Sequence, residues 1–110
     1  MPLYLYELSY TAESIAAQIK DPKDRLETAA RPALKAVGGK LVGGGFAFGD
    51  RDIVILYEAP DDESAAAVAL AVAAGGAVRT GKTTKLMTGA QWVASLKKAG
   101  AIGSAYKPAR

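Results

Sequence analysis

The sequence predicts one α+β domain in which strands and helices follow in the order β-α-β-β-α-β, with a short C-terminal helix and tail. Three observations carry this prediction. Four segments have the alternating or continuously apolar pattern of strands, and alanine-rich segments bounded by capping residues lie between them. The chain has 110 residues, which is the size of one domain. Half of the residues are hydrophobic and 23% are charged, a globular composition.

Residues 3–10 form the first predicted strand, because apolar and aromatic residues alternate along them. Tyr4, Tyr6 and Tyr10 fall on one face of this strand. Such a row of rings and hydroxyls can line a pocket, but it is also typical of a core or a subunit interface. We expect it to be the core or interface face.

Two helical starts follow this strand. Thr11 is a good N-cap for a short helix over residues 12–20. Asp21-Pro22 places a cap and a first-turn proline before a second helix, which the pair Gly38-Gly39 ends. Pro32 lies inside this second helix and has no backbone N–H, so we expect it to kink or restart the helix.

The central part of the chain predicts a hairpin and then a helix. Residues 40–48 form a strand that contains three consecutive glycines, and residues 52–58 form a nearly continuous apolar strand after a tight turn. An alanine-rich helix is expected over residues 64–74. The acids of Pro60-Asp61-Asp62-Glu63 lie at its start, where they stabilise it by interacting with the positive end of the helix dipole.

The last strand is expected over residues 77–87, followed by a helix over residues 90–99 with Trp92, Val93 and Leu96 as its anchor face. The resulting pattern is ferredoxin-like: a four-stranded antiparallel sheet with its long helices on one face. The other face then stays open. We expect a homodimer through this open face, with Tyr6 and Phe46 on it, which often closes a dimeric barrel.

Composition excludes several classes of site. The chain has no cysteine and no histidine, which rules out disulfides, thiol nucleophiles, Cys/His zinc sites, histidine-ligated haem and triads with a histidine base. The N-terminus lacks a basic region before Glu7, and no apolar run approaches the roughly 20 residues of a membrane span. We therefore expect a soluble cytoplasmic protein with no membrane partner.

Charge is distributed unevenly. Residues 1–63 hold all 11 acids and seven bases, whereas residues 64–110 hold seven bases and no acid. A one-sided basic segment can hold an anion, a nucleic acid or an acidic partner, although folding can also bring the two halves together and neutralise them. Nucleic-acid binding would use the late bases with Trp92 or Tyr106, but the aromatic pairs of an RNA-binding sheet are missing, so we do not expect it.

Two motifs have structural explanations. Residues 76–83 fit the phosphate-binding pattern G-x-x-x-x-G-K-[ST], but that loop needs a strand before it and a helix after it, and these residues alternate like a strand. The carboxylates Asp50 and Asp52 flank a turn, and those of residues 61–63 begin a helix. We expect neither a nucleotide nor a metal, and no cofactor.

Several segments together resemble the GYD domain family: Tyr4 to Glu13, Gly38-Gly39-Lys40, Gly49 to Asp62, the alanine-rich helix, and Ala77-Val78-Arg79-Thr80. The resemblance covers nearly all of residues 2–98. We therefore take residues 1–98 as the domain and residues 99–110 as a basic C-terminal tail. Arg51 stands before Asp52 where the name motif of the family has tyrosine. The resemblance implies a ferredoxin-like dimeric barrel and leaves the biochemical role unassigned.

The expected function is that of a homo-oligomeric small-molecule-binding or regulatory domain. The alternative is a cofactor-independent enzyme of dimeric-barrel type, whose acid or base would be tyrosine, aspartate, lysine or arginine. We expect an anionic or carbonyl group of a ligand near Arg79, because a guanidinium can form paired hydrogen bonds with a carboxylate. Possible wall residues are Tyr4, Tyr6, Tyr10 and Asp52. The other interpretation of Arg79 is an ion pair with Asp52 or Glu58.

Overall fold

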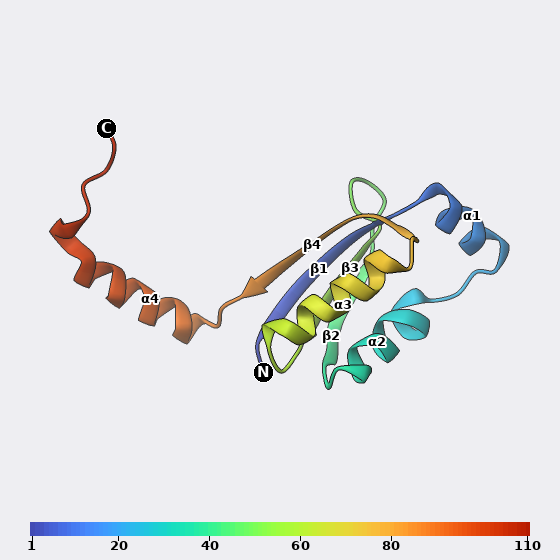
Figure 1. Cartoon of the computed structure of the whole chain (residues 1–110), viewed down its shortest axis with the longest axis horizontal. Coiled ribbons are helices and arrows are strands. Elements are labelled where there is room, and N and C mark those ends of the chain that lie inside the picture. The colour runs from blue at the N-terminus through green and yellow to red at the C-terminus, as the bar shows by residue number, and fades with distance from the viewer.

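The computed structural model describes residues 1–110 and contains four strands, β1 to β4, in one antiparallel sheet with the order β2-β3-β1-β4. The elements are β1 (Leu3–Tyr10), α1 (Ala12–Lys20), the π-helical segment η1 (Leu26–Ala30), α2 (Arg31–Ala36), β2 (Lys40–Phe46), β3 (Ile53–Glu58), α3 (Asp62–Ala74), β4 (Val78–Leu86), α4 (Gly89–Ile102) and the 3₁₀ turn η2 (Gly103–Ala105). Helices α2 and α3 lie side by side over one face of the sheet (Figure 1). The predicted α+β, ferredoxin-like fold is confirmed.

The two faces of β1 have different surroundings. Tyr4, Tyr6, Leu8 and Tyr10 are buried, whereas the alternate residues from Leu3 to Glu7 are only half-buried. Because side chains alternate across a strand, the tyrosines point to the helices and Leu3 and Leu5 point to the open face. Phe46 pairs with the buried Ile53 and shares its face. The expectation that Tyr6 and Phe46 lie on the open face is therefore wrong, and the tyrosine row belongs to the core.

The second helical segment begins later than expected. Asp21 ends α1, because its N–H donates to the carbonyl of Ala17 at 3.1 Å. Pro22 is therefore part of the connecting loop. Asp24 instead accepts a hydrogen bond from the N–H of Leu26 at 3.0 Å, and η1 begins there. Pro32 lies in the first turn of α2, so the expected restart of the helix is confirmed.

Glycine is required where η1 and the hairpin of β2 and β3 approach each other. A Cβ atom at Gly44 would clash with the backbone carbonyl of Val54 and would lie 3.4 Å from a methyl group of Leu26. Gly44 also has a φ of 152°. Gly44 therefore allows Leu26 to pack closely against the hairpin.

Helix α3 is fixed at its beginning and packs through small residues. Asp61 caps it by accepting a 2.8 Å hydrogen bond from the N–H of Ser64. Ala65 and Val68 are its buried residues. The small side chains let α3 lie close to the sheet.

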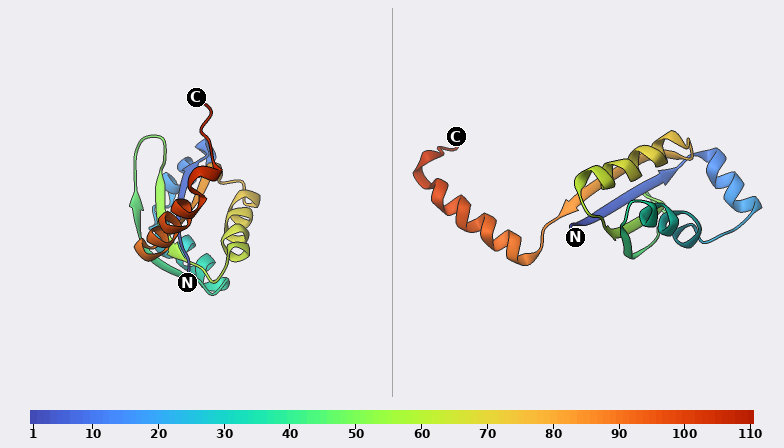
Figure 2. Two further views of the ribbon diagram at one scale, coloured as in Figure 1. Left: turned by 90° about the vertical axis from the view of Figure 1, so that its left-hand side faces the viewer. Right: turned by 60° about the horizontal axis from the view of Figure 1, so that its bottom comes forward.

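Helix α4 extends away from the rest of the chain (Figures 1 and 2). The radius of gyration is 17.6 Å, against about 13 Å for a compact chain of this length. The expectation that Trp92, Val93 and Leu96 anchor this helix to the domain is wrong, because they stay 59%, 50% and 54% exposed. No helix in the structure has the length and apolar character needed to cross a membrane.

Candidate functional site

A cavity of about 320 Å³ lies between the sheet and the helices that cover it. Side chains of β1 and β3 form its floor: Tyr6, Leu8, Tyr10, Ile53, Ile55 and Tyr57. Its roof consists mainly of small residues of η1, α2 and α3, among them Ala29, Ala30, Ala33, Val68 and Ala71. These alanines leave the space open. Arg25 is the one charged residue in the lining.

Tyr57 places an unpaired polar atom in this apolar region. Its side chain is fully buried, and its hydroxyl has no hydrogen-bond partner in the protein. Its ring stacks on that of Tyr4, with 5.3 Å between the centroids and an interplanar angle of 20°. Burial raises the pKa of the Tyr57 phenol, so at neutral pH this group is a hydrogen-bond donor.

Tyr6 and Tyr10 add two more phenols to the floor. The ring of Tyr6 packs beside Gly81 of β4, where an added Cβ atom would lie 3.4 Å from it, an ordinary contact distance. Burial raises the pKa of both phenols. For Tyr10 the nearby guanidinium of Arg25 lowers the pKa and opposes this rise. All three cavity tyrosines are therefore neutral donors at physiological pH.

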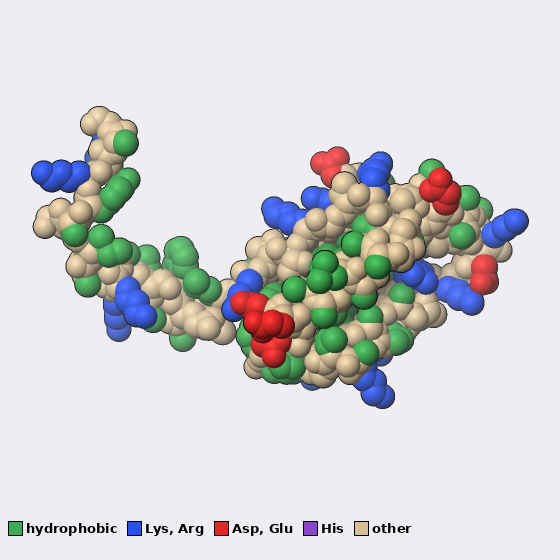
Figure 3. All heavy atoms as spheres, in the orientation of Figure 1, with side chains coloured by type: hydrophobic (Ala, Val, Ile, Leu, Met, Phe, Trp, Pro, Cys, Tyr) green, Lys and Arg blue, Asp and Glu red, His purple; other side chains and the backbone are tan.

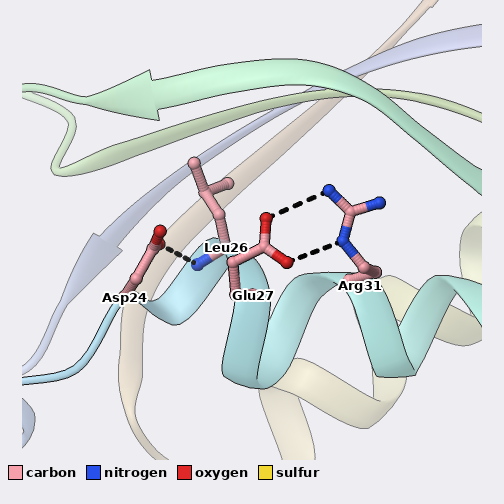
Figure 4. A network of polar contacts seen from close by, with 4 residues as sticks. All are labelled: Asp24, Leu26, Glu27 and Arg31. Atoms are coloured by element: carbon pink, nitrogen blue, oxygen red, sulfur yellow. Dashed lines mark hydrogen bonds and ion pairs between the residues drawn. The ribbon is translucent and has the colours of Figure 1, made fainter.

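Arg25 lies at the start of the segment that roofs the cavity. The N–H of Leu26 donates a hydrogen bond to the Asp24 carboxylate, as Figure 4 shows. This bond closes a turn around Arg25. Glu27 is paired with Arg31 through two hydrogen bonds of 2.8 and 3.0 Å (Figure 4). Arg25 itself is half-buried and takes part in none of the ion pairs of the chain. Its guanidinium therefore lies near Tyr10 and has no carboxylate partner.

Tyr4 has a structural contact instead of a place in the cavity. Its hydroxyl donates a 2.7 Å hydrogen bond to Asp62, which also pairs with Lys85 at 3.0 Å. Burial and then this bond raise the pKa of Tyr4 to about 12. Hydrogen bonds from Tyr4 and Lys85 lower the pKa of the Asp62 carboxyl. These contacts join β1 and β4 to the beginning of α3.

Asp52 and Arg79 also lie outside the main cavity. The Asp52 carboxylate accepts a 2.8 Å hydrogen bond from the backbone N–H of Tyr10. Arg79 is exposed and borders a smaller hollow of about 190 Å³ that shares Tyr6 with the main cavity. Neither Asp52 nor Glu58 lies within ion-pair distance of Arg79. Of the five expected site residues, Tyr6 and Tyr10 therefore meet in the main cavity.

A comparison with protein-family models matches the GYD domain over residues 4–95. The chain belongs to the GYD domain family. The match includes every residue that lines the cavity, so the cavity is formed entirely by the GYD domain. No curated protein and no solved structure matches the chain.

The phosphate-loop pattern of this GYD domain lies in a strand. Residues 78–83 belong to β4, which continues to Leu86, so the helix that such a loop precedes is absent. Gly81 of the pattern has a packing role instead, because a Cβ atom there would also lie 3.1 Å from a methyl group of Leu8. The expectation that these residues form a strand is confirmed.

Two cavity residues of the GYD domain were not expected from the sequence. Tyr57 lies on the same face as Ile53 and Ile55, and their alternation already indicates that it points into the core. What the sequence could not provide is its unpaired hydroxyl. Arg25 lies in a segment that was expected to be helical, with no pattern to indicate which way its side chain points.

Proposed function

We propose that this GYD domain binds a small, mostly apolar molecule that carries a carboxylate or carbonyl oxygen, in the cavity beneath η1, α2 and α3. The observation that carries the proposal is the hydroxyl of Tyr57, a fully buried donor without a partner on a residue that lines the apolar cavity. A buried hydroxyl without a hydrogen bond costs about 1–3 kcal/mol. An oxygen of a ligand, or a water in its absence, removes this cost.

Size and lining support the same proposal. A volume of about 320 Å³ is at the lower end of the range for small-molecule sites, which are apolar with a few placed polar groups. Here the polar groups are the phenols of Tyr6, Tyr10 and Tyr57 and the guanidinium of Arg25. All of them donate hydrogen bonds at neutral pH, so they suit a ligand with acceptor oxygens.

The protonation of these groups favours binding over catalysis. A general base should have a pKa near the working pH, but burial raises the pKa of the three phenols away from it. No carboxylate or lysine lines the cavity. A binding or regulatory role therefore suits this cavity better than a cofactor-independent acid–base reaction.

Calorimetric titration with two matched probes tests the proposal. The anion 2-naphthoate and the neutral 2-naphthylmethanol have the same apolar body. We expect both to bind, with the anion tighter. Tyr57→Phe should weaken either probe by about tenfold, the effect of one lost hydrogen bond. Arg25→Gln should weaken the anion alone.

Lys35→Gln provides a matched control, because it removes the same charge from an exposed position on α2 outside the cavity. It should leave both affinities unchanged. Equal weakening by Lys35→Gln and Arg25→Gln would mean that net charge, and not the cavity, attracts the anion. Absence of binding for both probes at millimolar concentration would refute the proposal, and so would equal affinities in Tyr57→Phe and the unmodified protein.

A further inference from the structure

The edge strand β4 turns Arg79, Gly81 and Thr83 towards the helix-covered face of the sheet. In the antiparallel register Thr83 lies opposite Tyr6, and Gly81 lies opposite Leu8. Residues that lie opposite each other in such a pair share a face, so both belong to the face of the buried tyrosines. Arg79 follows on this face by the same alternation.

Arg79 occupies a β-bulge at the beginning of this strand. Thr80 and Val78 pair with consecutive residues of β1, which leaves Arg79 between them without a partner residue. Arg79 lines the smaller hollow of about 190 Å³ and takes part in none of the ion pairs of the chain. Lys85 lies on the same face of β4, but Asp62 pairs with it at 3.0 Å. Arg79 is therefore the unpaired cation of this face.

Gly81 keeps part of the smaller hollow free of side-chain atoms and lies next to a phenol. It lines the smaller hollow and not the main cavity. A Cβ atom at this position would lie 3.6 Å from the hydroxyl oxygen of Tyr6. The hydroxyl end of Tyr6 therefore lies beside the smaller hollow. Together with the hydroxyl of Thr83 and the guanidinium of Arg79, it provides three groups that can donate hydrogen bonds there.

The opposite wall of the smaller hollow is apolar and carries no negative charge. It consists of Ala69, Val72 and Ala73 of α3, and no acid lines the hollow. The acids of α3 lie in its first turn, and no red side chain is seen along the rest of the helix in Figure 3. Donors on one wall and small apolar side chains on the other suit an oxyanion that has a short hydrocarbon part.

We propose that the smaller hollow is a second binding site, which takes the carboxylate or phosphate group of a small molecule. A guanidinium forms paired, charge-assisted hydrogen bonds with either group, and the two hydroxyls can donate to the remaining oxygens. The volume is below the range of about 300–1,000 Å³ for drug-sized ligands, so the molecule is small. The site borders Tyr6, as the main cavity does, but does not depend on the ligand proposed there.

NMR titration of the ¹⁵N-labelled protein at constant ionic strength tests this site, with phosphate and butyrate as probes. We expect saturable shifts of the backbone signals of Gly81 and Thr83 with at least one of the two anions. Saturation by phosphate alone assigns a phosphate ligand, and saturation by butyrate alone assigns a carboxylate. The neutral butan-1-ol should cause no such shifts. Absence of saturation with both anions at millimolar concentrations would overturn the proposal, and so would equal affinities for butyrate and butan-1-ol.

Two charge variants show whether Arg79 holds the anion. Arg79→Gln should weaken anion binding by about tenfold, the effect of one lost hydrogen bond to a charged group. Lys82→Gln removes the same charge from the other face of β4, where Lys82 lies opposite Glu7, and should leave the affinity unchanged. Equal weakening by the two variants would mean that net charge attracts the anion, and would overturn the proposal.

Two hydroxyl variants form a second matched pair, because each replaces a hydroxyl with a methyl group. Thr83→Val should weaken anion binding by about fivefold. Thr84 lies opposite Leu5 on the other face, so Thr84→Val should have no effect. Tyr57→Phe, which acts on the main cavity, should leave anion binding at the smaller hollow unchanged, so that each site can fail without the other. Loss of anion binding in Tyr57→Phe, or equal affinities in Thr83→Val and Thr84→Val, would overturn the second site.

Discussion

The hydroxyl of Tyr4 donates a 2.7 Å hydrogen bond to Asp62, 58 positions away in the chain. This bond joins the beginning of β1 to the first residue of α3, the helix that forms one side of the cavity roof. Tyr4 also stacks on Tyr57, whose unpaired hydroxyl we propose as the anchor for a ligand. Two neighbouring tyrosines thus have opposite roles: one hydroxyl is satisfied and structural, and the other is available.

Tyr4→Phe should destabilise the domain, because it removes a partly buried hydrogen bond to a charged group. We expect the thermal midpoint to fall by about 5 °C, the equivalent of roughly one kcal/mol for a domain of this size. Differential scanning calorimetry measures it. Tyr106→Phe, at a 66% exposed position in the tail, should have no effect. Equal midpoints for both variants and the unmodified protein would show that the Tyr4–Asp62 bond contributes nothing.

Stability should decrease at alkaline pH. The pKa of Tyr4 rises from its model-compound value of 10.0 to about 12 in the folded protein. A raised pKa stabilises the fold fully below pH 10, and this contribution is lost as the pH rises towards 12. Urea unfolding between pH 9 and 12 should show this decrease in the free energy of unfolding, with a smaller slope in Tyr4→Phe. The same slope in both proteins would contradict the assignment.

Tyr57→Phe should leave the unliganded protein as stable as before or make it more stable by about 1 kcal/mol. The substitution keeps the ring and removes a buried hydroxyl that no protein group satisfies. Urea denaturation of the two proteins measures the difference. A loss of more than 1 kcal/mol would indicate that the hydroxyl already has a strong partner and is not available to a ligand.

Gly44→Ala should cost more than about 2 kcal/mol, because the added Cβ atom would meet the carbonyl of Val54 and the backbone would have to move. Gly45→Ala is the matched control, since its Cβ atom meets nothing within 4 Å. The difference between the two free energies of unfolding is the measurement. Similar values would mean that β2 and β3 do not approach as closely as described.

The sequence predicted the sheet and its helices well, because strand alternation and helix caps are local signals. It did not predict which face of β1 the helices cover, since the tyrosines alternate with leucines and both faces are apolar. The beginning of the second helix was also missed. Asp21 can end one helix or begin the next, and the hydrogen bond from its N–H to Ala17 assigns it to the first.

The sequence indicated some residues of the candidate site and missed others. Tyr6 and Tyr10 were expected because they share a face of one strand. Arg79 was selected as a ligand anchor for its guanidinium and its place at the start of the last strand; it borders the smaller hollow, whereas the guanidinium in the main cavity is that of Arg25. Its position depends on the turn at Asp24 and on η1, and neither the turn nor a π-helical segment has a strong signal in one sequence.

The most direct test of the proposed ligand site is NMR of the protein with ¹³C-labelled tyrosine, titrated with 2-naphthoate. The chain has five tyrosines, and Tyr106 in the tail is an internal reference. We predict saturable shifts for the ring signals of Tyr6, Tyr10 and Tyr57, with Tyr106 unchanged, and loss of these shifts in a cavity-filling Ala33→Leu variant. Unchanged cavity signals at millimolar 2-naphthoate, or shifts that persist in Ala33→Leu, would contradict it.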